Sequence, residues 1–122
     1  MENRDPSWTY VCISVPLSKP EKDFIDDVDS PNVKTIKFTN QDKFKKYIYA
    51  DFVYEIQQKC NADFFDEYES EVLYPDMLPV AIEIVSKALK LKKNEYFKDY
   101  LEQTKEMMEL ALSFGTFVQF NF

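Results

Sequence analysis

The sequence predicts a single α+β domain in which helices pack on a small sheet. Two segments in the first third and one at the end are rich in the β-branched and aromatic residues typical of strands. Between them, three segments repeat apolar residues at the three- and four-residue spacing of amphipathic helices. The chain has 122 residues, of which 45% are apolar, close to the commonest size of one domain. We therefore expect residues 1–122 to form one domain in the approximate order β-β-α-α-α-β.

The first half contains two expected strands and one expected helix. Strands are predicted over residues 8–15 and 33–39, separated by a loop that contains three prolines. A helix is expected to begin after Thr39, since Thr39 and Asp42 resemble a capping box. The spacing of its apolar residues predicts that it ends near Lys59. Its apolar stripe is expected to consist of Phe44, Ile48, Phe52 and Ile56, widened by Tyr47, Tyr49 and Val53.

The second half contains two expected helices and a closing strand. Asp76 can cap the first of these helices, and Pro79 is tolerated because first-turn amides have no intrahelical partner. Asn94 is expected to cap the final helix, and Gly115 stands where a helix end favours a left-handed residue. Residues 116–122 alternate and contain three phenylalanines, so we expect this strand to lie inside the sheet, beside the first strand.

The residues most often used in catalysis are scarce in this chain. It has no histidine, one glycine and two cysteines, Cys12 and Cys60. This composition excludes Ser–His and Cys–His nucleophile pairs, most catalytic zinc sites and glycine-rich phosphate loops. Both cysteines are expected to be small buried hydrophobic side chains rather than reactive thiols. We expect no cofactor and no enzymatic activity, and paired carboxylates, assisted by a metal ion, are the open alternative.

The net charge of −7 bears on the kind of partner and on the compartment. Proteins that bind nucleic acid or anionic lipid normally carry excess positive charge, so neither is expected as a partner. No apolar stretch approaches the ~20 residues of a membrane span, and the polar start does not resemble a signal peptide. We expect a cytoplasmic protein that binds a basic or neutral protein.

The negative charge is concentrated between Lys59 and Lys87. The 27 residues between them contain seven acids and no lysine or arginine, whereas the rest of the chain balances 15 acids with 15 bases. Acidic groups speed the encounter with a basic partner, and buried aromatic anchors supply most of the affinity. Acids and aromatics together form the candidate partner-binding site: Asp63, Phe64, Phe65, Asp66, Glu67, Tyr68, Glu69, Glu71, Tyr74 and Asp76.

Other interpretations of this acidic segment stay open. Residues 61–74 could be a solvated connector whose aromatic side chains face the core. The acids could bind Ca²⁺, although the segment lacks the oxygen spacing and the glycine of an EF-hand loop. They could also serve only to keep the protein soluble. A further hypothesis is a structural or regulatory subunit that forms a homodimer through its aromatic surface.

Parts of the second half share a pattern with a known class of proteins. The pattern consists of Asp66–Glu69, Tyr74–Pro79, two helices and the closing segment Ala111–Phe120. In these features the chain resembles small bacterial immunity-type proteins, which are encoded beside polymorphic toxins and neutralise them by direct binding. The resemblance implies a non-catalytic inhibitor, often acidic because many toxin domains are basic nucleases. It transfers no functional residue, because such proteins bind through variable surfaces.

Overall fold

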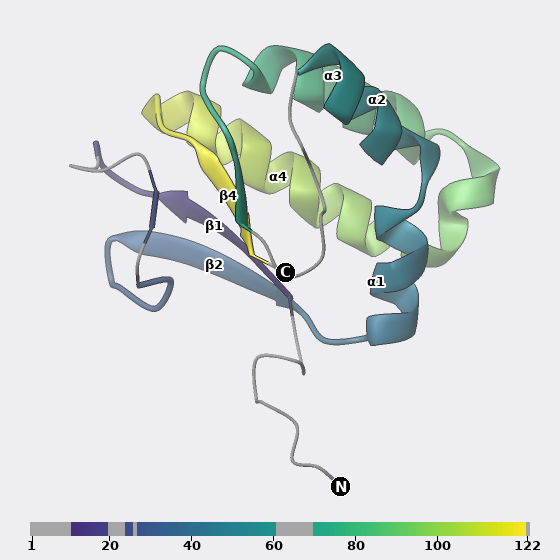
Figure 1. The fold of residues 1–122 in the computed structure, drawn as a ribbon, viewed down its shortest axis with the longest axis horizontal. Coiled ribbons are helices and arrows are strands. Elements are labelled where there is room, and N and C mark those ends of the chain that lie inside the picture. Colours follow the sequence, from purple (N-terminus) through teal and green to yellow (C-terminus); the bar gives the residue numbers. More distant parts are fainter. Residues whose placement is uncertain (1–10, 20–23, 26, 61–69, 122) are drawn as a thin grey trace, which may run out of the picture.

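The computed structural model describes residues 11–19, 24–25, 27–60 and 70–121 (Figure 1). The strands are β1 (Val11–Pro16), β2 (Val33–Phe38), β3 (Ser70–Leu73) and β4 (Val118–Asn121). The helices are α1 (Gln41–Ile48), α2 (Asp51–Lys59), α3 (Leu78–Leu89) and α4 (Lys98–Phe114), with the 3₁₀ helix η2 (Lys92–Phe97) between the last two. The strands form one antiparallel sheet in the order β2-β1-β4-β3. The expected α+β class is confirmed, and the C-terminal strand lies beside the first strand.

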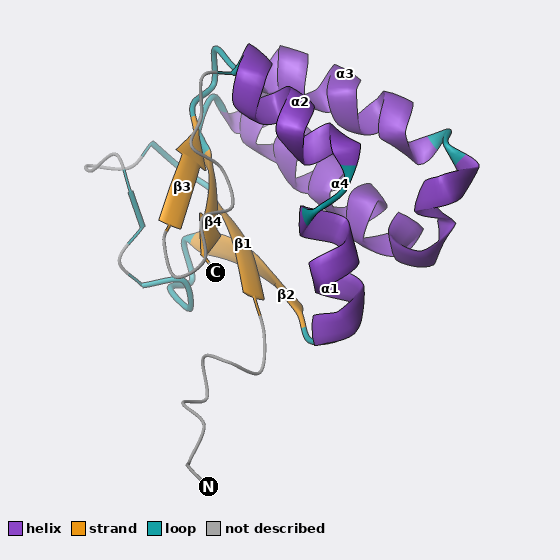
Figure 2. Cartoon of the chain, turned by 45° about the vertical axis from the view of Figure 1, so that its right-hand side comes forward, coloured by secondary structure: helices purple, strands orange, loops and turns teal. Residues whose placement is uncertain are grey.

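The helices form a layer on one face of the sheet (Figure 2). Ile13 of β1 lies opposite Ile36 of β2 and Phe120 of β4, and on the same face Leu73 of β3 lies opposite Val118. Four of these five side chains are buried, and Ile36 is partly buried against them, in the core that the helices close. The alternation expected for residues 116–122 therefore has a physical cause, because every second residue of β4 meets the helix layer.

The opposite face of the sheet is polar and is joined to the loop between β1 and β2. The Gln119 side chain accepts a hydrogen bond from the Ile25 amide (2.7 Å) and donates one to the Ile25 carbonyl (3.1 Å). Thr35 donates to the carbonyl of Val28 at 2.6 Å and shares a hydrogen bond with Ser14 at 2.9 Å. Within the described ranges, no buried side-chain nitrogen or oxygen lacks a hydrogen-bond partner.

An aromatic cluster joins the sheet to four helical segments: α1, α2, α4 and, through Phe97, whose ring centroid lies 6.1 Å from that of Tyr47, η2. Phe38, at the end of β2, stacks on Tyr100 of α4 with 3.9 Å between ring centroids. Tyr47 of α1 contacts Phe38 edge-on (5.5 Å) and Phe52 of α2 (5.2 Å). Thr104 donates its hydroxyl proton to the Tyr100 carbonyl, so the fully buried Tyr47 hydroxyl, 2.7 Å from the Thr104 oxygen, is the donor to it.

The helix expected to run from residue 40 to Lys59 is in fact two helices. The extended backbone of Ala50 separates α1 from α2, and Tyr49, expected on the apolar stripe, is 75% exposed. The break allows α1 to pack against η2 while α2 packs against α3. The cap was also misplaced by one residue, because Asn40 and not Thr39 accepts the hydrogen bond from the Lys43 amide.

Three predictions for the second half need correction, and two are confirmed. The acidic segment, interpreted as a connector, contains the edge strand β3. Asp76 does not cap α3, which begins after Met77 without a side-chain cap, although Pro79 lies in its first turn as expected. Asn94 is buried in η2, where its amide donates to the Ala88 carbonyl at 3.0 Å and so binds the end of α3. Gly115 does end α4 with a left-handed φ of 69°.

Both cysteines are free and buried, as expected. Burial is the main cause that raises the pKa of both the Cys12 and the Cys60 thiol. A raised pKa keeps a thiol protonated at neutral pH and so makes it a weak nucleophile.

The buried hydroxyl of Tyr47 predicts a distinctive response to alkali. Burial raises the pKa of Tyr47 well above its usual range, so the folded chain keeps a proton that the unfolded chain loses above pH ~10. Stability should therefore be unaffected by this group below pH ~10 and should fall as the pH rises further. In Tyr47→Phe, we expect this alkaline fall to be less steep by up to about 1.4 kcal/mol per pH unit. Urea unfolding between pH ~9 and ~11.5 measures the slope.

Tyr54→Phe is the matched control, because it removes an exposed tyrosine hydroxyl. At pH 7, Tyr47→Phe should cost about 1 kcal/mol through the lost hydrogen bond to Thr104. Equal alkaline slopes for the wild type and Tyr47→Phe would contradict the burial of this hydroxyl.

The contact between Gln119 and Ile25 predicts a local effect on the loop. Gln119→Met keeps the length of the side chain but removes both hydrogen bonds to Ile25, leaving its backbone groups without their partner, and also the one that Gln119 donates to Asn121 at 3.1 Å. We expect a loss of about 1–3 kcal/mol in unfolding free energy and at least about tenfold faster amide exchange at Ile25. Gln58→Met, on the exposed side of α2, is the control. Unchanged exchange at Ile25 would show that Gln119 does not hold the loop.

Candidate functional site

The structure describes three of the ten predicted partner-binding residues. Glu71 lies in β3, half-buried, on the sheet face that meets the helices. Tyr74 and Asp76 lie in the turn that leads from β3 to α3, and both are exposed. The structure therefore brings Tyr74 and Asp76 together on the surface and places Glu71 apart from them. The other seven lie outside the described residues: Asp63, Phe64, Phe65, Asp66, Glu67, Tyr68 and Glu69.

The turn with Tyr74 lies at the end of the molecule where α3 begins and α4 ends. After η2, α4 packs along α3 in the opposite direction, so its last turns return to the start of α3 (Figure 1). The Tyr74 ring contacts Phe117, between α4 and β4, with a centroid distance of 6.2 Å and an interplanar angle of 62°. This contact fixes the position of Tyr74, which is still 45% exposed.

Exposed apolar and acidic side chains occur together at this end. Val80 in the first turn of α3 and Leu112 in the last turns of α4 are both exposed. Asp76 and Glu109 are exposed, and neither forms an ion pair with any part of the chain that the structure describes. We call this surface the acidic end and define it by Tyr74, Asp76, Val80, Glu109 and Leu112.

Three of the five residues of the acidic end, Val80, Glu109 and Leu112, are not among the predicted partner-binding residues. Glu109 and Leu112 lie 35 and 38 residues after Tyr74, and only the reversal of the chain at η2 brings the end of α4 back to it. One local signal was available, because α4 carries acids on its outer face and has no basic residue in its last turn. Helices generally favour positive charge there.

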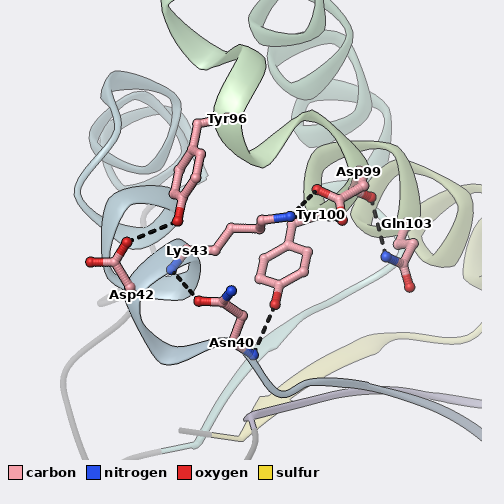
Figure 3. Close-up of polar contacts among 7 residues, drawn as sticks. All are labelled: Asn40, Asp42, Lys43, Tyr96, Asp99, Tyr100 and Gln103. Atoms are coloured by element: carbon pink, nitrogen blue, oxygen red, sulfur yellow. Dashed lines mark hydrogen bonds and ion pairs between the residues drawn. The ribbon is translucent and has the colours of Figure 1, made fainter.

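A second surface lies at the opposite end of the α3–α4 pair, where α1 packs on η2 and on the start of α4 (Figure 3). The Lys43 ammonium lies 3.3 Å from a carboxylate oxygen of Asp99 and 5.3 Å from the ring centroid of Tyr100. Tyr96 donates its hydroxyl proton to Asp42 at 2.9 Å, and this hydrogen bond is the main cause that raises the pKa of Tyr96. These contacts fasten α1 to η2 and α4.

Two lysine-rich runs far apart in the sequence converge on this surface. The first runs through α1 and the second from the end of α3 into α4, with the exposed rings of Tyr49 and Tyr96 among them. We call this surface the lysine–tyrosine end; it consists of Lys43, Lys45, Lys46, Tyr49, Lys90, Lys92, Lys93, Tyr96 and Lys98. Within the described ranges, only Lys43 and Lys93 among these lysines form ion pairs, with Asp99 and Asp51.

The described residues provide neither a candidate metal centre nor a candidate membrane span. Across residues 11–19, 24–25, 27–60 and 70–121, no group of three or more His, Cys, Asp or Glu is placed to hold a metal ion. No helix in those same ranges is both long and apolar enough to cross a membrane.

The fold and its surfaces define a small α+β protein with two oppositely charged ends. No protein-family model, curated protein or solved structure matches this chain. Any assignment of function therefore rests on the chemistry of these two surfaces.

Proposed function

We propose that this chain is a non-catalytic protein-binding module whose acidic end docks on a basic protein. The observation that carries the proposal is the coincidence, at one end of the fold, of exposed apolar side chains with carboxylates that have no ion pair among the described residues. Asp51, Glu83 and Asp99, by contrast, are each paired with a lysine.

Tyr74 is the expected anchor of this interface. Its ring is already packed against Phe117, so little side-chain freedom would be lost when a partner covers the exposed part. Tyrosine is enriched among the residues that dominate binding energy, because it combines a large apolar ring with a polar hydroxyl. Val80 and Leu112 add exposed apolar area to the same surface.

Asp76 and Glu109 are the expected steering charges. Exposed carboxylates around an apolar anchor raise the rate of encounter with a basic surface and disfavour acidic partners. Acidic side chains towards the C-terminal end of α4 interact unfavourably with the partial negative charge of that helix end, and no basic residue in the last turn offsets them. Their placement thus suits an external basic partner better than it suits the stability of α4.

The class of protein that we propose is an immunity-type inhibitor of a basic toxin. A small acidic domain that lacks histidine matches the demands of such an inhibitor, which has to bind tightly but needs no catalytic group. The resemblance of the second half to immunity-type proteins supports the same class, and Tyr74 and Asp76 lie within the residues that carry it.

Affinity capture with matched variants tests this function. The immobilised wild type, exposed to lysate of the source organism, should retain a basic protein at low salt and release it at high salt. The acidic-end variant Tyr74→Ala/Glu109→Gln should bind the same protein about 30-fold or more weakly, because it loses the anchor and one steering charge.

Tyr54→Ala/Glu95→Gln is the control, since it removes an exposed tyrosine and an exposed acid away from the acidic end. It should retain the protein as the wild type does. Equal retention by the acidic-end variant would refute the site, and failure of the wild type to retain any basic protein would refute the function.

A further inference from the structure

The lysine–tyrosine end has no role in the proposed function, yet it has the features of a docking surface. Tyr96 is 49% exposed and Tyr49 is 75% exposed. Lys45, Lys46 and Lys92 are exposed, and none of them forms an ion pair with a described residue. Exposed tyrosines among unpaired positive charges form a surface that an acidic, partly apolar partner would complement.

We propose that this partner is the acidic end of a second copy of the same chain, so that copies associate head to tail. The inference rests on the proposed function in one respect, because both use the acidic end as a docking surface. Each copy offers the complementary pair: lysines with Tyr49 and Tyr96 at one end, carboxylates with Tyr74 at the other.

Exposed apolar side chains, together with charge, favour a second copy over a nucleic acid as the occupant. A phosphate backbone offers the lysines negative charge alone, whereas the acidic end of a second copy also offers Tyr74, Val80 and Leu112 to the exposed rings of Tyr49 and Tyr96. A second copy also carries net negative charge, but its acidic end approaches the lysines first. At physiological ionic strength charges more than about 8 Å apart are largely screened, so the local attraction dominates over the repulsion between whole molecules.

The geometry of the two ends determines the form of the assembly. The two surfaces are different and lie at opposite ends of the α3–α4 pair, so the contact is heterologous rather than two-fold symmetric. Heterologous contacts that do not close into a ring continue into an open chain. Because each contact occupies an acidic end, self-association and binding of the basic partner exclude one another.

Sedimentation equilibrium with two complementary variants tests the inference. The first, Lys46→Gln/Lys92→Gln, neutralises the lysine–tyrosine end, and the second, Asp76→Asn/Glu109→Gln, neutralises the acidic end. At ~0.15 M salt and up to ~1 mM protein, the weight-average mass of the wild type should exceed twice the monomer mass. At ~0.5 M salt, this mass should return to that of the monomer. Each variant alone should associate about tenfold more weakly than the wild type.

The mixture of the two variants is the decisive sample. One variant keeps the acidic end and the other keeps the lysine–tyrosine end, so together they form a single intact contact. Their mixture should therefore reach a 1:1 complex and stop there. The control Lys19→Gln/Lys34→Gln, two exposed lysines outside either surface, should associate like the wild type.

A wild type that stays monomeric under these conditions would overturn the inference, as would a mixture that associates no more than its components. So would binding of a labelled single-stranded oligonucleotide by a monomeric wild type with loss of that binding in Lys46→Gln/Lys92→Gln. The two proposals fail separately. If a basic protein is retained through the acidic end while the wild type remains monomeric, only the self-association is wrong; if the wild type self-associates but retains no basic protein, only the proposed function is wrong.

Discussion

The aromatic cluster around Tyr47 is the interaction on which the rest of the structure depends. Its rings come from the end of β2, from α1, α2, η2 and α4, so it joins the sheet to almost every helical segment. The hydrogen bond from Tyr47 to Thr104 satisfies the one polar atom that this residue carries into the core. Because the cluster fixes α1 against η2 and α4, it also brings the two lysine-rich runs together on one surface.

The sequence predicted the fold class because its strongest local patterns agree with the final packing. Phe44, Ile48, Phe52 and Ile56 are all buried, as their spacing indicated. The same regular spacing concealed the break at Ala50, because the apolar positions of α1 and α2 fit one uninterrupted stripe. The strand β3 was missed because it has only four residues and lies among acids that suggested a solvated connector.

The candidate sites were predictable only where they are local in the chain. Tyr74 and Asp76 were identified because aromatic and acidic residues are neighbours in the sequence there. Glu109 could not be added, since its proximity follows from the return of α4 along α3, and no pattern within α4 specifies where that helix packs. The lysine–tyrosine end needed the convergence of runs that begin at Lys43 and Lys90, nearly fifty residues apart. Surfaces assembled from distant segments depend on tertiary structure, whereas core faces follow from periodicity.

The central claim is that this protein acts through its acidic end, and amide hydrogen exchange on the complex with the retained basic protein tests it most directly. Binding there should slow exchange around residues 74–80 and 109–114, where the acidic end lies, and leave residues 43–46 and 92–96 as they are in the free protein. Protection confined to the lysine–tyrosine end, or absent from both ends, would contradict the account.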